Sequence, residues 1–488
     1  MKTKRAKVTY LIALLVIVGL LIFLGTSFQG KPNPVLTIDG ETVETNTPFA
    51  ATFWSLLPPI VAIALALISK EVYSSLFFGC LVGALLYTQF HPWETIVELV
   101  GSNYGIISVL ADSYDMGIIV FLVVLGIMVD LMNKGGGSEA FGRWAKHSVK
   151  TRCGAQLITM LLGVLIFVDD YFNCLTVGAV MRPVTESHKI SRAKLAYIID
   201  ATAAPVCMIA PVSSWAAAVS GYVTSSTVNG FDMFIKQIPY NYYCLLTLVM
   251  IVVTSLLNLD YGPMLKHEYN AQVKDDLFTT EERPFEGADD YEKPAKGKSS
   301  VLDLVLPVVV LIVACIIGMI YSGGYFDGND FISAFSDADA AVGLSIGGLI
   351  GLVFTFLYFW IRGSIDFDKS FESVPKGFIQ MIAPILILTF AWTLCSFTRN
   401  AMYSAEFVKA AMAGAGELKV FLPAIIFIIG CAIGFATGTS WGTIGIMAPI
   451  VVNVFNYDVD PVLCTIGLAA ACAGGVMGDH CSPISDTT

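Results

Sequence analysis

The chain has 488 residues, of which 56% are hydrophobic and only 14% are charged. Soluble domains carry about 25% charged residues, so the composition excludes an ordinary soluble protein and predicts one embedded in a membrane. The net charge of −11 comes without a basic stripe, which excludes nucleic acid as a partner. The eleven cysteines lie in or beside apolar runs, which is typical of helix packing and excludes a disulfide framework or a zinc site.

Apolar runs of about 20 residues predict spanning helices. In chain order they lie at 8–28, 53–69, 72–90, 116–133, 195–222, 240–259, 301–321, 340–361 and 378–398. The first run predicts an extra N-terminal transmembrane helix within residues 1–30. It is too long for the core of a signal peptide, and no clear small-residue cleavage site follows it.

Lysine and arginine concentrate on one side of this predicted topology. Cytoplasmic loops are enriched in both, and the N-terminus carries four of them in its first seven positions. If it lies in the cytoplasm, so do the segments 69–71, 134–152, 182–194, 260–300 and 361–377. Of the chain's 28 lysines and arginines, the exterior segments then contain only Lys31, Lys236, Arg399, Lys409 and Lys419. We therefore predict a multi-pass protein of the cytoplasmic (cell) membrane with a cytoplasmic N-terminus.

Two segments must enter and leave the membrane on the same side for this asymmetry to hold. The first is about 153–185, with a polar tip at 168–174; the second is about 420–455, with a tip at 435–442. The arms of the first are about a dozen residues long, too short to span. We predict two re-entrant helical hairpins, the first entering from the inside and the second from the outside.

The two halves of the chain repeat the same order of elements. Each hairpin is followed by an apolar helix that Pro or Gly interrupts, at 204–214 in the first half and 473–483 in the second. Since the hairpins enter from opposite sides, the halves predict an inverted repeat. The predicted fold class is an all-α polytopic membrane protein with two inverted-topology repeats, each with a re-entrant helical hairpin and a broken transmembrane helix.

The predicted boundaries follow from this order. The first repeat covers 50–260, with its broken helix at about 195–222, and the second covers 301–488, with its broken helix at about 462–488. The linker at 260–300 carries charges of both signs, which predicts a mobile cytoplasmic connector with no role of its own. The second repeat lacks a counterpart to the helix at 240–259, so we expect the natural chain to continue with one more apolar span.

Polar groups gather at the hairpin tips and helix breaks, where carboxylates are costly unless they serve a function. A sodium ion prefers oxygen ligands, and a buried carboxyl beside a second one holds a proton readily because like charges repel. A site that holds either Na⁺ or H⁺ exchanges them when its access alternates. The candidate ion- and proton-binding residues are Asp169, Asp170, Asn173, Thr176, Asp200, Ser213, Ser214, Thr437, Thr439, Ser440, Asp479, His480, Ser482, Asp486 and Thr487. Those predicted to hold Na⁺ are Asp169, Asp170, Asn173, Thr437 and Asp479; no catalytic residue and no cofactor besides the transported ion is expected.

Each candidate also has a plainer interpretation. The Asp169-Asp170 pair can cap a helix or pair with Arg182, and Asp200 can pair with a cytoplasmic arginine. His480 can hydrogen-bond a carbonyl instead of relaying protons. The small residues of the second tip can serve close helix packing, and Trp215 and Trp441 can be packing or can line the site.

The C-terminal sequence Gly478-Asp479-His480-Cys481-Ser482-Pro483-Ile484-Ser485-Asp486-Thr487-Thr488 closely resembles the signature of the NhaC-type Na⁺/H⁺ antiporter family. The segments 167–173 and 204–214 also resemble that family, and the match covers most of the chain after about residue 56. The resemblance implies secondary transport within the larger ion-transporter superfamily, elevator-like movement and a homodimer. The family also contains malate/sodium-lactate exchangers and amino-acid carriers, so it leaves the substrate open.

The favoured function is exchange of Na⁺ for H⁺ by a secondary transporter, with membrane lipid, Na⁺ and H⁺ as partners. The alternative is Na⁺- or H⁺-coupled transport of a small organic acid or an amino acid, with Arg182 and Arg399 as possible carboxylate partners. An intramembrane aspartyl protease is a remote alternative, since residues 475–479 only loosely imitate its Gly-x-Gly-Asp sequence. A pore is a third, because broken helices also occur in channels.

Overall fold

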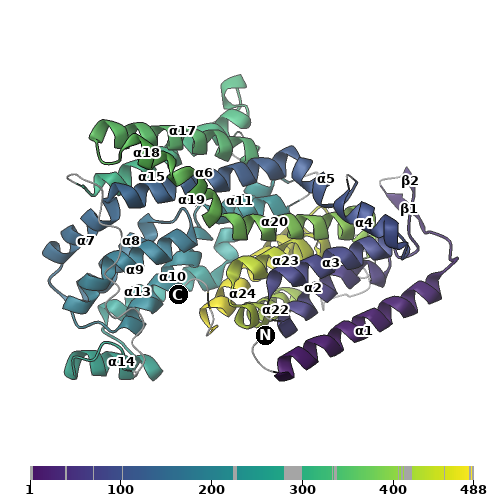
Figure 1. The fold of residues 1–488 in the computed structure, drawn as a ribbon, viewed down its shortest axis with the longest axis horizontal. Helices are drawn as coiled ribbons and strands as arrows, with labels where there is room; N and C mark the ends of the chain where they lie inside the picture. The colour runs from purple at the N-terminus through teal and green to yellow at the C-terminus, as the bar shows by residue number, and fades with distance from the viewer. Residues whose placement is uncertain are drawn as a thin grey trace. The chain divides into compact units, whose positions relative to one another are not determined.

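The computed structural model describes residues 4–38, 41–69, 71–101, 103–223, 228–279, 299–331, 334, 338–404, 406–407, 410, 420–455, 457–482 and 485. These residues are mostly helical (Figure 1). The strands among them are β1 (Val35–Ile38) and β2 (Glu41–Glu44), which pair antiparallel with Val35 opposite Glu44. The apolar runs predicted from the sequence lie on helices, as expected for an all-α membrane protein.

The chain divides into two compact units, and each draws segments from both halves of the sequence. Unit 1 comprises Met1–Met116, Ala218–Asn241 and Ala383–Ser485; unit 2 includes Gly117–Ala217 and Tyr242–Ile382. The units therefore do not follow the boundaries predicted for the two repeats, which concern the order of elements along the chain and stay a prediction.

Unit 1 holds the N-terminal helices and the second predicted hairpin. Its helices are α1 (Lys4–Phe28), η1 (Phe53–Leu56), α2 (Leu57–Ser69), α3 (Val72–Tyr87), α4 (Pro92–Val100), α5 (Ile106–Ala111), α12 (Gly230–Gln237), η2 (Ile238–Tyr240), α20 (Ile382–Cys395), η4 (Ser396–Ala401), α22 (Leu422–Thr437), α23 (Ser440–Val454) and α24 (Pro461–His480). Helix α11 (Ser214–Tyr222) begins in unit 2 and ends in unit 1.

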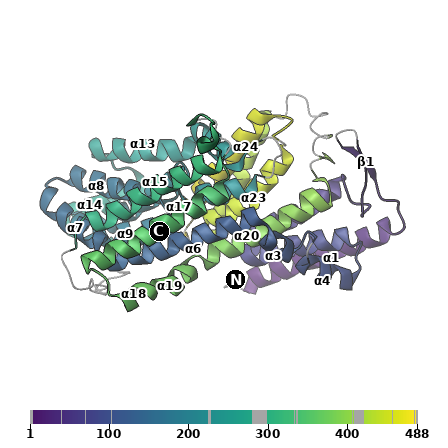
Figure 2. The ribbon, with the colours of Figure 1, turned by 90° about the horizontal axis from the view of Figure 1, so that it is seen from above.

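Unit 2 holds the first predicted hairpin. Its helices are α6 (Ser113–Gly135), α7 (Gly137–Ser148), α8 (Arg152–Leu165), α9 (Asp170–Ser187), α10 (Arg192–Cys207), α13 (Tyr242–Leu256), α14 (Gly262–Val273), α15 (Leu302–Ser322), η3 (Tyr325–Asp327), α17 (Ala340–Arg362), α18 (Phe367–Phe371) and α19 (Ser373–Gln380). Helices α15 and α17 run side by side (Figure 2), and the carbonyl of Gly343 lies so close to Gly318 that a side chain there would clash.

Within the described ranges, five helices are long and apolar enough to cross a membrane: α6, α15, α17, α20 with η4, and α24. A sixth span results if α12 with η2 and α13, which meet at a 50° bend, count as one. Several further apolar helices of the predicted topology are shorter, including α2, α3 and α8. These helices make the chain a multi-pass membrane protein.

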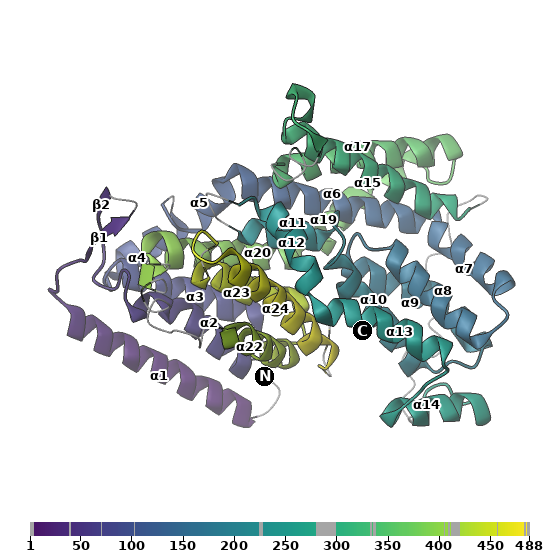
Figure 3. The same cartoon turned by 180° about the vertical axis from the view of Figure 1, so that it is seen from behind.

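The broken helix predicted in the first half is broken in the structure, because α10 ends at Cys207 and α11 begins at Ser214. The break predicted at 473–483 is wrong for its first part, since α24 continues without interruption to His480. Its glycines allow close packing. Helices α22 and α24 lie side by side (Figure 3). The backbone of α22 passes so near Gly474 and Gly478 that an added Cβ would lie 2.5 Å from a carbonyl oxygen at each position. Small residues at a helix interface let two backbones approach closely.

The first part of the segment predicted as a linker contains a helix, and its role as a connector stays a prediction. Residues Gly262–Val273 form α14, and its Glu268 is buried. A solvated connector would not bury a carboxylate, because burial of an unpaired charge is costly. The remaining part of the predicted connector, 280–298, lies outside the described residues.

Candidate functional site

The tip of the first hairpin meets the break between α10 and α11 within unit 2. The hairpin arms α8 and α9 are separated by residues 166–169. The backbone amide of Ser214 donates to the carbonyl of Val168 at 2.8 Å, and the indole Nε1 of Trp215 donates to Oδ2 of Asp170 at 3.0 Å. Asp169, Asp170 and Trp215 are all buried. The start of α11 therefore holds the backbone of the hairpin tip and the carboxylate of Asp170.

A serine organises this break locally. The hydroxyl of Ser213 lies 2.8 Å from the carbonyl of Cys207 and 3.1 Å from that of Ala210, and it accepts the amide of Ala216 at 3.0 Å. The hydroxyl therefore satisfies carbonyl groups at and after the end of α10 and an amide at the start of α11. Such groups at helix ends have no hydrogen-bond partner within the helix. Ser213 is thus a structural residue of the break, and its neighbour Ser214 is presented at the hairpin tip.

Two oxygen atoms at this tip are buried without a hydrogen-bond partner among the described residues, Oδ1 of Asn173 and Oγ of Ser214. The amide nitrogen of Asn173 is occupied, because it donates to the carbonyls of Gly163 at 2.7 Å and Ile166 at 3.1 Å. These two bonds fix the orientation of the Asn173 side chain, and its Oδ1 then has no hydrogen-bond partner among the described residues. A buried polar atom without a partner is rare and calls for an explanation such as an ion.

The oxygen-rich character of the tip decides which ion it suits. Carboxylate, amide and hydroxyl oxygens are ligands of hard cations. Over the described part of the chain, no three His, Cys, Asp or Glu side chains form a group that could hold a metal ion. A set of oxygen ligands is typical of sites for hard cations, whereas softer metals prefer thiolate or imidazole ligands.

Two other predicted residues of unit 2, Thr176 and Asp200, are also buried. The hydroxyl of Thr176 is 3.4 Å from the amide oxygen of Asn133 on α6. Asp200 is buried within α10, seven residues before that helix ends. Asp130 on α6 pairs with Lys134 at 3.0 Å one helical turn later.

The second candidate region, in unit 1, lies where the second hairpin meets the end of α24. Gly438 has a left-handed backbone (φ of +69°) and ends α22, and Thr439 then caps α23. Oδ2 of Asp479 accepts two hydrogen bonds from Ser440, from its amide at 3.1 Å and from its hydroxyl at 2.7 Å. Asp479 therefore sits at the N-terminus of α23, where the helix dipole stabilises an ionised carboxylate.

The other hydroxyls of the second tip serve the hairpin itself. Thr437 donates to the carbonyl of Ile433 at 2.8 Å, and Thr439 accepts the amide of Gly442 at 3.3 Å. Ser482 donates to the carbonyl of Phe435 at 3.0 Å, which ties the chain after α24 to the hairpin. His480 is the last residue of α24 and is half-buried. Asp486 and Thr487 lie outside the described residues.

The two tips are chemically complementary. The first carries its carboxylates on the hairpin and its hydroxyls on the helix break, whereas the second carries hydroxyls on the hairpin and its carboxylate at the end of α24. Because the tips belong to different units, the predicted meeting of both in one shared pocket stays a prediction.

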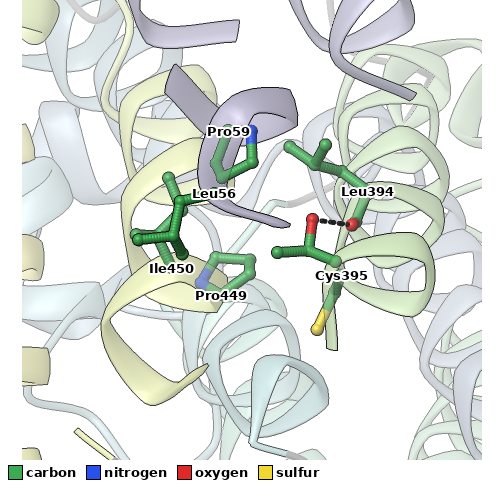
Figure 4. A pocket seen from close by; sticks show the side chains of 7 residues that line it. Leu56, Pro59, Leu394, Cys395, Pro449 and Ile450 are labelled. Carbon is green, nitrogen blue, oxygen red and sulfur yellow. Dashed lines mark hydrogen bonds between the residues drawn. The ribbon is translucent and has the colours of Figure 1, made fainter. Parts of the chain in front are cut away.

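Sequence analysis missed a π-helix in unit 1. Residues Ser396–Ala401 form this turn, which is directly continuous with α20. π-Helical turns occur frequently at functional sites. A small apolar pocket lies beside it, lined by Leu56, Pro59, Leu394, Cys395, Thr398, Pro449 and Ile450 (Figure 4). In it, the hydroxyl of Thr398 bonds the carbonyl of Leu394 at 2.7 Å. Its charge-free lining suits packing better than ion binding, and no sequence pattern marks a π-turn.

Comparisons with known proteins agree with a transporter. The family model described as "Na+/H+ antiporter family" matches residues 206–488, more than half of the chain. An uncharacterised protein of Haemophilus influenzae is 34% identical over 453 residues, covering 90% of this chain and 84% of that protein.

A solved structure is also similar, that described as "Structure and Function of Neisseria gonorrhoeae MtrF Illuminates a Class of Antimetabolite Efflux Pumps". It is 14% identical, with a TM-score of 0.46 over 89% of this chain and 86% of that one. A likeness at this level carries no argument about substrate. The family match over residues 206–488 does identify the chain, which belongs to the Na⁺/H⁺ antiporter family and is a membrane transporter rather than an enzyme.

Proposed function

We propose that this transporter exchanges Na⁺ for H⁺ across the cytoplasmic membrane, and that the first hairpin tip binds both ions. The observation that carries the proposal is the cluster of buried oxygens there. Asp169 and Asp170 are adjacent in sequence and buried, and the same tip region holds two buried oxygens, Oδ1 of Asn173 and Oγ of Ser214, that have no hydrogen-bond partner among the described residues. The family of the chain supports the same function.

The chemistry of exchange follows from this composition. Two neighbouring buried carboxylates repel each other, so the pair is stabilised by one positive charge. That charge can be a proton on a carboxyl oxygen or a sodium ion held by the same oxygens. Because binding of one displaces the other, alternating access to the two sides of the membrane couples their movements in opposite directions.

Asp479 contributes differently in this proposal. Its carboxylate is bonded to the second hairpin through Ser440, so it serves as a fixed negative charge near the end of α24. The predicted approach of this charge to the first tip would add a ligand or a counter-charge for the bound cation.

Re-entrant hairpins with opposite orientation belong to the same proposal. The arms α8, α22 and α23 have 14, 16 and 15 residues, which correspond to about 21–24 Å at 1.5 Å per residue and fall short of a hydrocarbon core of about 30 Å. With α9, they would form two hairpins that enter from opposite faces and place both tips inside the membrane. The homodimer implied by the family resemblance and the cytoplasmic N-terminus are part of this picture.

Reconstitution tests the proposal directly. Na⁺-dependent proton flux is measured in proteoliposomes for the wild type and for Asp169→Asn, Asp170→Asn and Asp479→Asn, with the exposed Asp275→Asn as the matched control. We expect the first two variants to lose exchange, Asp479→Asn to weaken it, and the control to behave as the wild type.

Two outcomes would contradict parts of the proposal. Normal exchange in all three site variants would remove the site assignment while leaving the function. If the wild type dissipated a preformed proton gradient with malate or lactate but not with Na⁺, the protein would be an organic-acid carrier.

A further inference from the structure

Four charged side chains form a buried cluster at the base of the first hairpin, at the opposite end of α8 from the ion site. The guanidinium of Arg152 contacts the carboxylate of Glu268 and lies 3.9 Å from that of Asp260. Asp260 in turn pairs with the ammonium of Lys194 at 3.0 Å. The exposed side-chain fractions are 1% for Glu268, 4% for Lys194, 9% for Asp260 and 19% for Arg152. Two acids and two bases balance, which makes such burial tolerable.

This cluster joins segments that are distant in sequence. Arg152 is the first residue of α8, and Lys194 lies in the first turn of α10. Their acidic partners both come from the segment 260–278, which we call the clamp. Two hydrogen bonds also join the clamp to the start of α10. Glu268 accepts the amide of Ser191 at 2.8 Å, and the carbonyl of Leu277 accepts the amide of Arg192 at 3.0 Å.

The buried contacts of the clamp differ from its surface pair. Lys189 and Asp275 lie 2.8 Å apart, but their side chains are 52% and 75% exposed. Exposed pairs contribute little, because water screens them. Removing one partner of the buried cluster instead leaves a charge without compensation. The strength of the clamp therefore lies in Glu268 and Asp260.

The helices held by the clamp lead to the ion site. Helix α8 runs 14 residues to the hairpin tip and α10 runs 16 residues to the break, about 21 and 24 Å at the rise of an α-helix. Beyond these ends, the segment after α8 and the start of α11 are joined, because the amide of Ser214 donates to the carbonyl of Val168. The two helices also pack against each other between these ends, because Gly163 of α8 lies against Thr202 of α10. The buried cluster adds a fixed connection at their starts.

We propose that the clamp positions the ion site, with Glu268 as its main positioning residue. By fixing α8 against the start of α10, it keeps the tip that bears Asp169 and Asp170 in register with the break at 208–213. The transport part of this inference rests on the proposed function, whereas the structural part does not.

The test combines hydrogen–deuterium exchange with transport on the full-length protein. The variants are Glu268→Gln, which removes the buried charge, and Asp275→Asn, which removes the exposed one. A double variant, Arg152→Met with Glu268→Gln, removes both partners and leaves no orphaned charge. Peptides covering 166–173 and 207–214 report on the site, and the melting temperature reports on stability.

For Glu268→Gln we expect deuterium exchange at both peptides to accelerate about fivefold or more. In the transport assay, the Na⁺ concentration for half-maximal proton flux should rise about tenfold, with a smaller change in the maximal flux. Asp275→Asn should match the wild type. The double variant should recover the melting temperature but keep the fast exchange, because the clamp is still missing. If Glu268→Gln alone does not fold, the double variant carries the same comparison.

Deuterium exchange at the tip as slow as in the wild type, in Glu268→Gln and in the double variant, would overturn the proposal. So would a double variant that regains both the melting temperature and slow deuterium exchange, since Glu268 would then only neutralise Arg152. If the wild type moved no Na⁺, the proposed function would fail. The deuterium-exchange comparison would still test whether the clamp positions the tip.

Discussion

Replacement of Gly478 by Ala probes the tight contact between α22 and α24 next to the buried carboxylate of Asp479. A Cβ at position 478 would lie 2.5 Å from the carbonyl oxygen of Cys431 and 2.9 Å from the Cα of Gly434. Both are backbone atoms, which cannot rotate away. One helix must shift by about 0.9 Å to reach ordinary contact at 3.4 Å.

A shift of that size has two measurable consequences. Overpacking of this kind costs about 1–3 kcal/mol, or roughly 5- to 150-fold in the ratio of folded to unfolded protein. A shift of α24 by this amount along the 2.7 Å bond between Ser440 and Asp479 would lengthen that bond to about 3.6 Å, beyond hydrogen-bonding distance. We therefore expect a lower melting temperature and weaker Na⁺-dependent proton flux.

The matched control is Gly430→Ala on the same interface. Its Cβ would lie 3.3 Å from the backbone of Gly474, which a shift of a few tenths of an ångström relieves. Thermal unfolding in detergent and flux in proteoliposomes are measured side by side for both variants. A Gly478→Ala protein as stable and as active as the wild type would refute the reasoning, because the two backbones could not then be this close.

Three further predictions use single contacts. Ser440→Ala removes a hydroxyl bond to a buried carboxylate, which contributes about 1.5–3 kcal/mol, and should lower both melting temperature and flux; an unchanged melting temperature would contradict it. Trp215→Phe removes the indole bond to Asp170 and should destabilise more than Trp392→Phe, whose indole bonds only a backbone carbonyl at 3.1 Å; equal losses in thermal unfolding would speak against a charge-assisted bond. Asp303→Asn removes a buried carboxylate that accepts from Tyr358 and pairs with the partly exposed Arg362, and it should cost about 1–3 kcal/mol, whereas an unchanged melting temperature would contradict it.

The sequence predicted most elements because their signals are local. Apolar runs and breaker residues act over one or two helical turns, so the positions of the helices and of the break between Cys207 and Ser214 follow from them. The same reasoning failed at α24, where glycine was interpreted as a breaker. There the neighbouring backbone of α22 explains the glycines, and local propensity cannot reveal it.

The candidate site divides in the same way. From the residues alone, Asp169, Asp170 and Asp479 were predicted at helix ends within apolar surroundings, because a carboxylate inside an apolar run is conspicuous without any partner in view. The folded chain was needed to reveal that Trp215 bonds Asp170, that Ser440 bonds Asp479, and that Glu268 is buried against Arg152. Each of these contacts joins residues separated by 39 positions or more, and such pairings depend on how whole helices pack, which hydropathy along the chain does not encode.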